Sequence, residues 1–131
     1  MAVVLDTRFL IAHTFPSTAQ EREKIASFTA RVATGGVLAS SISIVEFVKV
    51  AGGRIGKDAA ATRLRIWKKG GLEFIPVSEE IGFLSGELAQ SHTGVPLGDA
   101  VIAATARNAS AAVVTDDPHY SGLGVKTLWF R

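Results

Sequence analysis

The sequence contains no cysteine and few residues of several other kinds, with 4 prolines, 2 tryptophans, 1 tyrosine and 1 methionine among 131 residues. The absence of cysteine excludes disulfides, thiolate metal ligands and cysteine nucleophiles. No run approaches the roughly 18 uninterrupted apolar residues that suggest a membrane span, and we expect no membrane partner. The start of the chain lacks the basic region of a signal peptide, so we expect a cytoplasmic protein.

The chain also lacks a large excess of either sign of charge, because 14 Lys and Arg against 12 Asp and Glu leave a net charge of only +2. The chain is 47% hydrophobic, and its length fits one domain with one core. We therefore predict a single domain over residues 1–131. Any function that depends on charge must depend on where the charges lie rather than on their sum.

Short apolar segments alternate with segments of helical periodicity. The expected strands are residues 2–5, 37–39, 73–75, 111–114 and 125–128, with helices between them. The first strands show no polar alternation, which is typical of strands buried on both faces of a parallel sheet. This order predicts an α/β fold, a three-layer α/β/α sandwich with a mostly parallel central sheet.

Local signals predict where the helices begin and end. Thr18 and Glu21 have the spacing of a capping box at the start of one helix. Gly52 and Gly53 are expected to end a later helix, and Ser78 to cap another. The last long helix is expected over residues 97–108.

Acidic residues directly follow two of the expected strands. Asp6 follows the first, and Asp116 and Asp117 follow the strand that ends near Thr115. In an open parallel sheet, ligands bind at the carboxyl ends of the strands, near the point where the strand order reverses. Carboxylates from two separate strands can therefore share one crevice.

Two further acids, Glu46 and Asp99, lie in helices that are too apolar to have a wide solvent face. An unpaired buried carboxylate is costly and needs a base, a hydrogen-bond donor or a metal. Lys49 is close enough in sequence to pair with Glu46, whereas no Lys or Arg lies within four residues of Asp99.

Each acid taken alone has an ordinary explanation. Asp6 can cap a helix, Asp99 can complement a helix dipole, Glu46 can face solvent, and residues 116–117 can form a turn. A shared explanation is a hard divalent cation, which would relieve the repulsion between converging carboxylates. Oxygen ligands suit Mg²⁺ or Mn²⁺, and such sites carry out phosphoryl chemistry.

Four motifs, in this order, are VLDTRFLI at 4–11, SISIVEF at 41–47, DAVIAATA at 99–106 and TDDPHY at 115–120. Together they resemble the PIN-domain ribonucleases, in particular the small VapC-type toxins of toxin–antitoxin pairs. The resemblance covers essentially the whole chain. It implies metal-dependent hydrolysis of RNA phosphodiester bonds, with no covalent intermediate.

The resemblance also implies roles for individual residues. The catalytic, metal-holding quartet would be Asp6, Glu46, Asp99 and Asp117. Hydroxyl groups that orient the carboxylates would come from Thr7 and Thr115, with Asp116 as an outer charge. Arg8 stands where the family commonly has a small hydroxyl residue, and it could reach a substrate phosphate or point away. No dedicated base is evident, and the candidates are His119 and His13.

Basic residues gather in one segment, at Arg54, Lys57, Arg63, Arg65, Lys68 and Lys69. Together with Arg8, these are the expected RNA contacts, although a solvated helix face explains the same pattern. Trp67 in this segment can stack on a base or pack in the core. The resemblance further implies a small antitoxin partner and a homodimer.

Other enzyme classes fit less well. A phosphatase of the haloacid-dehalogenase type needs Asp-x-Asp after the first strand, but this chain has Asp6, Thr7 and Arg8. A dinucleotide-binding fold lacks its glycine-rich motif. The alternative that stays open is a PIN-like module that binds RNA or protein without catalysis, although all four acids are present.

Overall fold

The computed structural model describes residues 1–131, apart from the side chain of Ala33. In the described chain, five strands form one sheet: β1 (Val3–Leu5), β2 (Val37–Ser40), β3 (Leu72–Ile75), β4 (Ala112–Thr115) and β5 (Thr127–Trp129). The helices are α1 (Thr7–Thr14), α2 (Ala19–Val32), α3 (Ile42–Ile55), α4 (Lys57–Lys69), α5 (Glu79–Ser91) and α6 (Leu97–Asn108). Two short 3₁₀ helices complete the described elements, η1 (Ala33–Gly35) and η2 (Pro118–Gly122).

The strand order is β3-β2-β1-β4-β5, and every neighbouring pair is parallel. Val3 pairs with Val37 of β2 on one side and with Ala112 of β4 on the other. The chain builds outward from β1 through β2 to β3, and then adds β4 and β5 on the opposite side. The strand order therefore reverses between β1 and β4, at the position where an open sheet offers a binding crevice.

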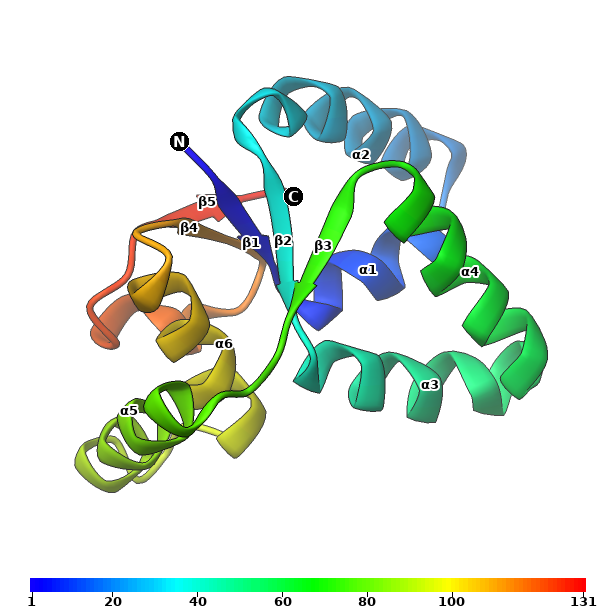
Figure 1. The fold of residues 1–131 in the computed structure, drawn as a ribbon. Coiled ribbons are helices and arrows are strands. Elements are labelled where there is room, and N and C mark those ends of the chain that lie inside the picture. The colour runs from blue at the N-terminus through cyan, green and yellow to red at the C-terminus, as the bar shows by residue number, and fades with distance from the viewer.

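Helices cover both faces of the sheet (Figure 1). Helices α1 to α4 pack on one face around Phe9 and Phe47, while α5, α6 and η2 pack on the other around Ile102 and Tyr120. The three-layer α/β/α prediction is confirmed, and the sheet is wholly parallel in the described residues. None of the described helices is long and apolar enough to cross a membrane.

Strand β1 is buried on both faces. Leu5 packs with the α1–α4 layer and Val4 with the α5–α6 layer. This arrangement explains why the segment shows no polar alternation in the sequence, because neither side of the strand meets water. The order of strands and helices expected from the sequence is confirmed along the whole chain.

Two expected helix signals are corrected by the structure. Helix α3 continues through Gly52 and Gly53 and ends before Gly56, whose φ of +90° suits glycine. The cost of two helical glycines, about 1 kcal/mol each, is outweighed by the packing of this helix around buried residues such as Ala51. Only half of the expected capping box forms: Thr18 Oγ accepts from the Glu21 N–H at 3.0 Å, while the Glu21 carboxylate binds Ser17 and Arg131.

Candidate metal centre and its cavity

Asp6 lies at the reversal point of the sheet. Its backbone N–H donates to the Val114 carbonyl at 3.0 Å, which holds the residue beside β4. Asp6 precedes α1, yet its side chain makes no capping hydrogen bond and instead accepts from Thr115 Oγ at 2.7 Å. The residue is only 2% exposed. Helix capping therefore does not account for this carboxylate.

Asp117 follows β4 and lies across the same edge of the sheet. Its Oδ1 accepts from the His119 N–H at 2.9 Å, and its own N–H donates to Thr115 Oγ at 2.9 Å. The Thr115 hydroxyl thus connects Asp6 with Asp117. The turn expected at residues 116–117 exists, and the Asp117 carboxylate that caps η2 also faces the crevice.

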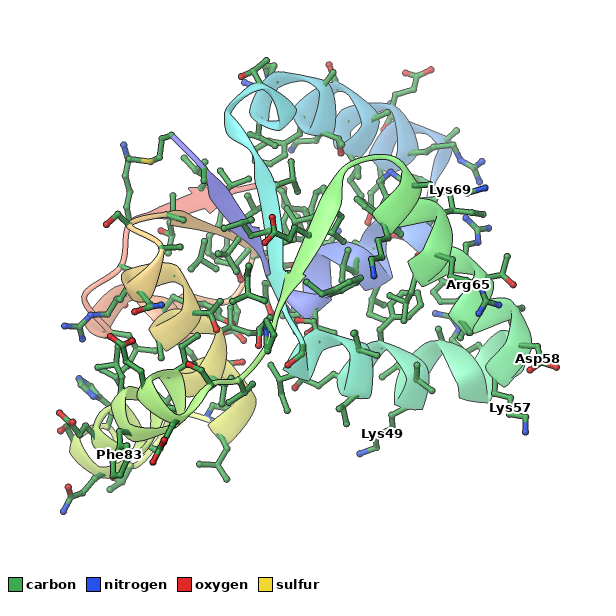
Figure 2. The ribbon with its side chains drawn as sticks, viewed as in Figure 1. Lys49, Lys57, Asp58, Arg65, Lys69 and Phe83 are labelled. Atoms are coloured by element: carbon green, nitrogen blue, oxygen red, sulfur yellow. The ribbon has the colours of Figure 1, made fainter. Side chains whose placement is uncertain are left out.

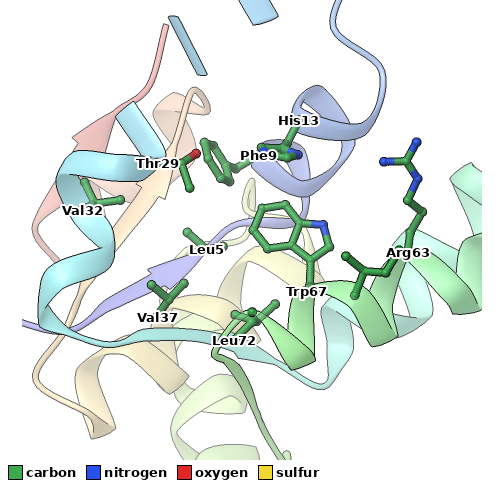
Figure 3. A pocket seen from close by; sticks show the side chains of 11 residues that line it. Leu5, Phe9, His13, Thr29, Val32, Val37, Arg63, Trp67 and Leu72 are labelled. Carbon is green, nitrogen blue, oxygen red and sulfur yellow. The ribbon is translucent and has the colours of Figure 1, made fainter. Parts of the chain in front are cut away.

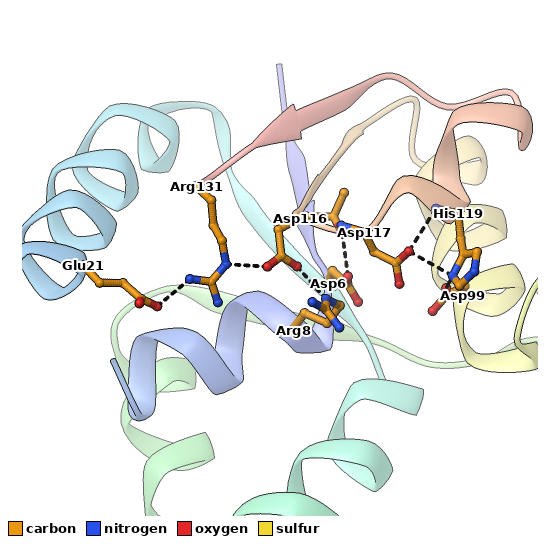
Figure 4. A network of polar contacts seen from close by, with 9 residues as sticks. Asp6, Arg8, Glu21, Asp99, Asp116, Asp117, His119 and Arg131 are labelled. Carbon is orange, nitrogen blue, oxygen red and sulfur yellow. Dashed lines mark hydrogen bonds and ion pairs between the residues drawn. The ribbon is translucent and has the colours of Figure 1, made fainter. Parts of the chain in front are cut away.

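Asp99 joins these groups from the first turn of α6. One ligand atom from each of Asp99, Asp117 and His119 lies within 4.8 Å of the others. His119 Nδ1 is 3.1 Å from Asp99 Oδ2 and 2.9 Å from Asp117 Oδ1 (Figure 4). A helix-dipole role for Asp99 does not explain why other acids crowd around it.

Glu46 reaches the same crevice from α3. Its Oε1 accepts a hydrogen bond of 2.6 Å from Thr7 Oγ, and its carboxylate lies against Gly98 so closely that a Cβ at that position would collide with it. No described side chain forms an ion pair with Glu46, and Lys49 points away from the molecule (Figure 2). Glycine at position 98 is what lets Glu46 approach the start of α6.

Burial and repulsion from neighbouring carboxylates act on the protonation of Asp6 and Asp99. Burial, with a contribution from the charge of Asp99, raises the pKa of Asp6 to about 6. Burial, followed by the charge of Asp117, raises the pKa of Asp99 to about 6 despite the neighbouring His119. The Tyr120 hydroxyl is buried beside these acids, and burial together with the charges of Asp6 and Asp99 raises its pKa.

These residues fit a divalent cation. Four carboxylates come together from four separate places in the fold, and burial and crowding oppose the ionisation of Asp6 and Asp99. The donor set is oxygen-rich, with one imidazole nitrogen, which suits Mg²⁺ or Mn²⁺.

A cavity of about 400 Å³ opens beside the acids and is lined in part by Asp6, Glu46 and Asp99. Its other charged lining comes from Arg8, Asp116, Arg131 and Glu21. The Asp116 carboxylate binds Arg8 Nε and Arg131 Nε, each at 2.5 Å, rather than the quartet. These two hydrogen bonds outweigh the effect of burial and lower the pKa of Asp116.

The expected RNA contacts are spread over different parts of the surface. Arg8 lines the acidic cavity, and Arg54 lies 4.0 Å from the ring centroid of Phe15, which lines it too. In contrast, α4 presents Lys57, Arg65 and Lys69 outward (Figure 2). Lys68 and Arg63, the remaining residues of the basic segment, are also exposed, and Arg63 lines a second cavity.

That second cavity, of about 290 Å³, lies among α1, α2 and α4 and is mainly apolar (Figure 3). Phe9, His13 and Trp67 line it, and the His13 and Trp67 ring centroids are 4.5 Å apart. Trp67 is therefore packed against the core. His13 lines this cavity and not the acidic one, so among the two candidate bases only His119 lies with the acids.

The sequence matches the family model of the PIN domain over residues 3–126. The chain belongs to the PIN-domain family. This membership confirms the resemblance seen in the four sequence motifs. No curated protein sequence matches the chain.

Solved structures of PIN-domain proteins have the same fold. VapBC2 from Rickettsia felis, solved with a promoter DNA fragment, matches with a TM-score of 0.81 and 19% identity over 100% of both chains. VapBC-1 from Haemophilus influenzae matches with a TM-score of 0.78 and 17% identity, covering 99% of this chain and 98% of the other. VapC20 from Mycobacterium tuberculosis is described as a toxin that cleaves the sarcin-ricin loop. It matches with a TM-score of 0.77 and 18% identity, covering 94% of this chain and 95% of the other.

Sequence reasoning missed two residues at the cavity, Gly98 and Arg131. Gly98 had a detectable signal, because glycine is a poor helix former and stands directly before Asp99 in the first helical turn. Arg131 had none, because its partners Glu21 and Asp116 are 110 and 15 residues away in the sequence.

Proposed function

We propose that the protein is a ribonuclease that hydrolyses RNA phosphodiester bonds with the help of Mg²⁺ or Mn²⁺. The observation that carries this proposal is the convergence of Asp6, Glu46, Asp99 and Asp117 at the reversal point of the sheet. Membership of the PIN-domain family supports it.

In this proposal, Asp6, Glu46, Asp99 and Asp117 hold the cation. A divalent cation in such a site supplies hydroxide near neutral pH and neutralises charge on a phosphoryl transition state. Thr7 and Thr115 fix the orientation of the Glu46 and Asp6 carboxylates through the hydrogen bonds described above. His119 is the side-chain candidate for accepting a proton, because it lies at the acids.

The same proposal places the protein as the toxin of a toxin–antitoxin pair. It is supported by the fold shared with VapBC complexes from Rickettsia felis and Haemophilus influenzae. We expect a small antitoxin protein as partner, a homodimer of this chain, and action on RNA in the cytoplasm. Light scattering on the purified chain tests the dimer: a monomer mass at micromolar concentration would remove that part of the proposal.

Cleavage of RNA tests the central part. A mixed set of structured and single-stranded RNAs is incubated with Mg²⁺ or Mn²⁺, or with EDTA, using the wild-type protein, Asp6→Asn and Asp58→Asn. Asp58 is an exposed acid on α4 and serves as the matched control. We expect cleavage that requires the metal and Asp6 but not Asp58.

The outcome also separates the two functions considered. Cleavage that survives Asp6→Asn, or that continues in EDTA, would contradict the metal-dependent mechanism. RNA binding without any cleavage, by folded protein free of a co-purified partner, would favour a PIN-like module that binds RNA without catalysis.

A further inference from the structure

Two arginines meet at a single buried carboxylate beside the acids. Arg8 Nε donates to Asp116 Oδ1, and Arg131 Nε donates to Asp116 Oδ2, both at 2.5 Å (Figure 4). Arg8 comes from the first turn of α1, whereas Arg131 follows β5, so the sheet and the helix hold the two side chains independently. We call Arg8, Asp116 and Arg131 the arginine clamp.

The clamp leaves much of each guanidinium free. The Asp116 side chain is only 5% exposed, whereas the Arg8 and Arg131 side chains are 56% and 46% exposed. Arg8 makes no described side-chain hydrogen bond through its terminal nitrogens, and Arg131 uses one of them to bind Glu21 at 2.8 Å. The Nε edges are thus anchored on Asp116 while other N–H donors of both side chains are available to a ligand.

A guanidinium held in this way is suited to a phosphate. Its planar set of donors matches two phosphate oxygens, and an anchored side chain loses less conformational freedom when it binds. Arg8 and Arg131 face two carboxylates, Asp116 and Glu21, so the free N–H donors rather than a net positive charge offer an anion site next to the strongly negative crevice.

The clamp lines the same cavity of about 400 Å³ as Asp6, Glu46 and Asp99. Figure 4 shows them in a row, with Arg131 and Glu21 at one end, Arg8 beside Asp6 in the middle, and Asp99 with His119 at the other end. An RNA strand with one phosphate at the acids would bring a neighbouring phosphate toward the clamp. The outward-facing cations of α4 do not line this cavity.

We propose that Arg8 and Arg131, held together by Asp116, bind a backbone phosphate of the RNA next to the one that is cleaved. Binding there sets which phosphate lies at the acids, so both arginines are positioning residues for the strand. The inference rests on the proposed ribonuclease activity. A purely structural role, in which the clamp only ties α1 to the end of β5, is the alternative that the experiment must exclude.

The experiment uses a short single-stranded RNA that the wild-type protein cleaves, with steady-state kinetics for Arg8→Gln and Arg131→Gln. We expect KM to rise about tenfold for each variant while kcat stays within about twofold, which corresponds to the removal of one charge-assisted hydrogen bond. The slope of log kcat/KM against log salt should become shallower by about 0.7 for each phosphate that is no longer bound. Arg107→Gln is the control, because Arg107 is exposed at the far end of α6 from Asp99 and should change neither quantity.

A second set of substrates locates the phosphate. Single phosphates beside the cleaved bond are replaced, one at a time, by an uncharged methylphosphonate. One such position should raise KM for the wild-type protein about tenfold and have little further effect on Arg131→Gln, because that variant no longer binds the phosphate at that position. A structural tie would instead lower the melting temperature of the variants and leave the methylphosphonate pattern unchanged.

The failures of the two proposals are distinguishable. If the wild-type protein cleaves RNA but KM and the salt slope are the same in Arg8→Gln and Arg131→Gln as in the wild type, the clamp inference is wrong and the ribonuclease proposal stands. If the wild-type protein cleaves no RNA with either metal, the ribonuclease proposal fails and the clamp inference fails with it. Arg8→Lys and Arg131→Lys cover the case of a variant that does not fold, and they should show an intermediate rise in KM because the charge remains but the planar set of donors is absent.

Discussion

Helix α1 borders two cavities, of about 400 and 290 Å³, that differ in the side chains lining them. Arg8 faces the first cavity, as does Asp6, which directly precedes the helix. Phe9 and His13, four residues apart, face the second cavity. The second cavity is mainly apolar. Among its described lining residues, the one buried polar side-chain atom without a hydrogen-bond partner is His13 Nδ1. The first contains carboxylates whose charges are not balanced by the protein.

An enclosed shape does not by itself mark a reactive site. The apolar cavity has the more hydrophobic walls, yet its described residues bring together no set of groups that could bind a charged substrate. The acidic cavity concentrates charge that raises the pKa of Asp6 and Asp99. Perturbed acids in a cleft are the better guide to chemistry.

The largest expected effect comes from removing a carboxylate of the acidic cavity. Asp99→Asn keeps the size of the side chain but removes a charge from the proposed cation site, so RNA cleavage in Mn²⁺ should fall on the order of a thousandfold, equivalent to about 4 kcal/mol. The unfolding temperature in EDTA should not fall, because the substitution removes a charge that its neighbours repel. Single-turnover cleavage and thermal denaturation measure the two quantities, and activity within tenfold of wild type would exclude Asp99 from the site.

Truncation of the wall of the apolar cavity should act on stability alone. Phe9 is fully buried and lies near the rings of Phe28, Trp67 and Phe130 at centroid distances of 5.0 to 6.3 Å. Phe9→Ala should lower the free energy of unfolding by about 3 to 5 kcal/mol in urea denaturation. Val45→Ala on the exposed surface is the control and should cost less than about 0.5 kcal/mol.

The two cavities should respond to pH in opposite directions when no metal is present. The pKa of Asp6 is raised from 3.8 to about 6 in the folded protein, so stability from this group is complete below about pH 4 and is lost as pH rises to about 6, by up to about 3 kcal/mol. Burial, followed by the charge of Arg63, lowers the pKa of His13, so His13 destabilises the protein as pH falls below its ordinary value of 6.5. Urea denaturation in EDTA from pH 4 to 8 measures both effects. Asp6→Asn should abolish the loss of stability as pH rises to about 6 and should keep the loss that His13 causes as pH falls.

Gly98→Ala should affect the acidic site and leave the apolar cavity unchanged, because it adds a methyl group only beside Glu46. The methyl group displaces the Glu46 carboxylate, so Mn²⁺ affinity should fall about tenfold. The free energy of unfolding should stay the same or rise by about 0.5 to 1 kcal/mol, because alanine is the better helix former. In Gly86→Ala, the control, an added Cβ meets nothing within 4 Å; equal affinities in both variants would contradict the role of Gly98.

The smallest expected effect comes from His13. Its buried Nδ1 has no hydrogen-bond partner among the described residues, so His13→Leu should stabilise the protein by about 1 kcal/mol. RNA cleavage should be unchanged, because His13 lines the apolar cavity. A loss of cleavage with an intact fold would place His13 at the reaction after all.

The sequence predicted the order of strands and helices because each element carries its own local pattern. The buried run of β1, the Ser78 cap of α5 and the span of α6 all follow from nearby residues. The end of α3 could not be predicted, because packing against buried residues carries the helix through Gly52 and Gly53.

The acids of the candidate site were also visible in the sequence, since each borders an apolar segment. Their convergence depends on the sheet order, which places β1 beside β4 although more than 100 residues separate Asp6 from Asp117. The arginine clamp could not be predicted, because the partners of Asp116 come from the two ends of the described chain. Contacts between distant segments are set by the fold and leave no local pattern.

Titration of Mn²⁺ into the metal-free protein at pH 7.5, followed by calorimetry, tests the central claim most directly. We compare the wild-type protein with Asp6→Asn and with Asp58→Asn, which changes an exposed acid on α4. We expect saturable uptake by the wild-type protein and by Asp58→Asn, and a loss of that uptake in Asp6→Asn. No saturable binding by the folded wild-type protein, or equal binding by Asp6→Asn, would contradict the assignment of these carboxylates as a metal centre.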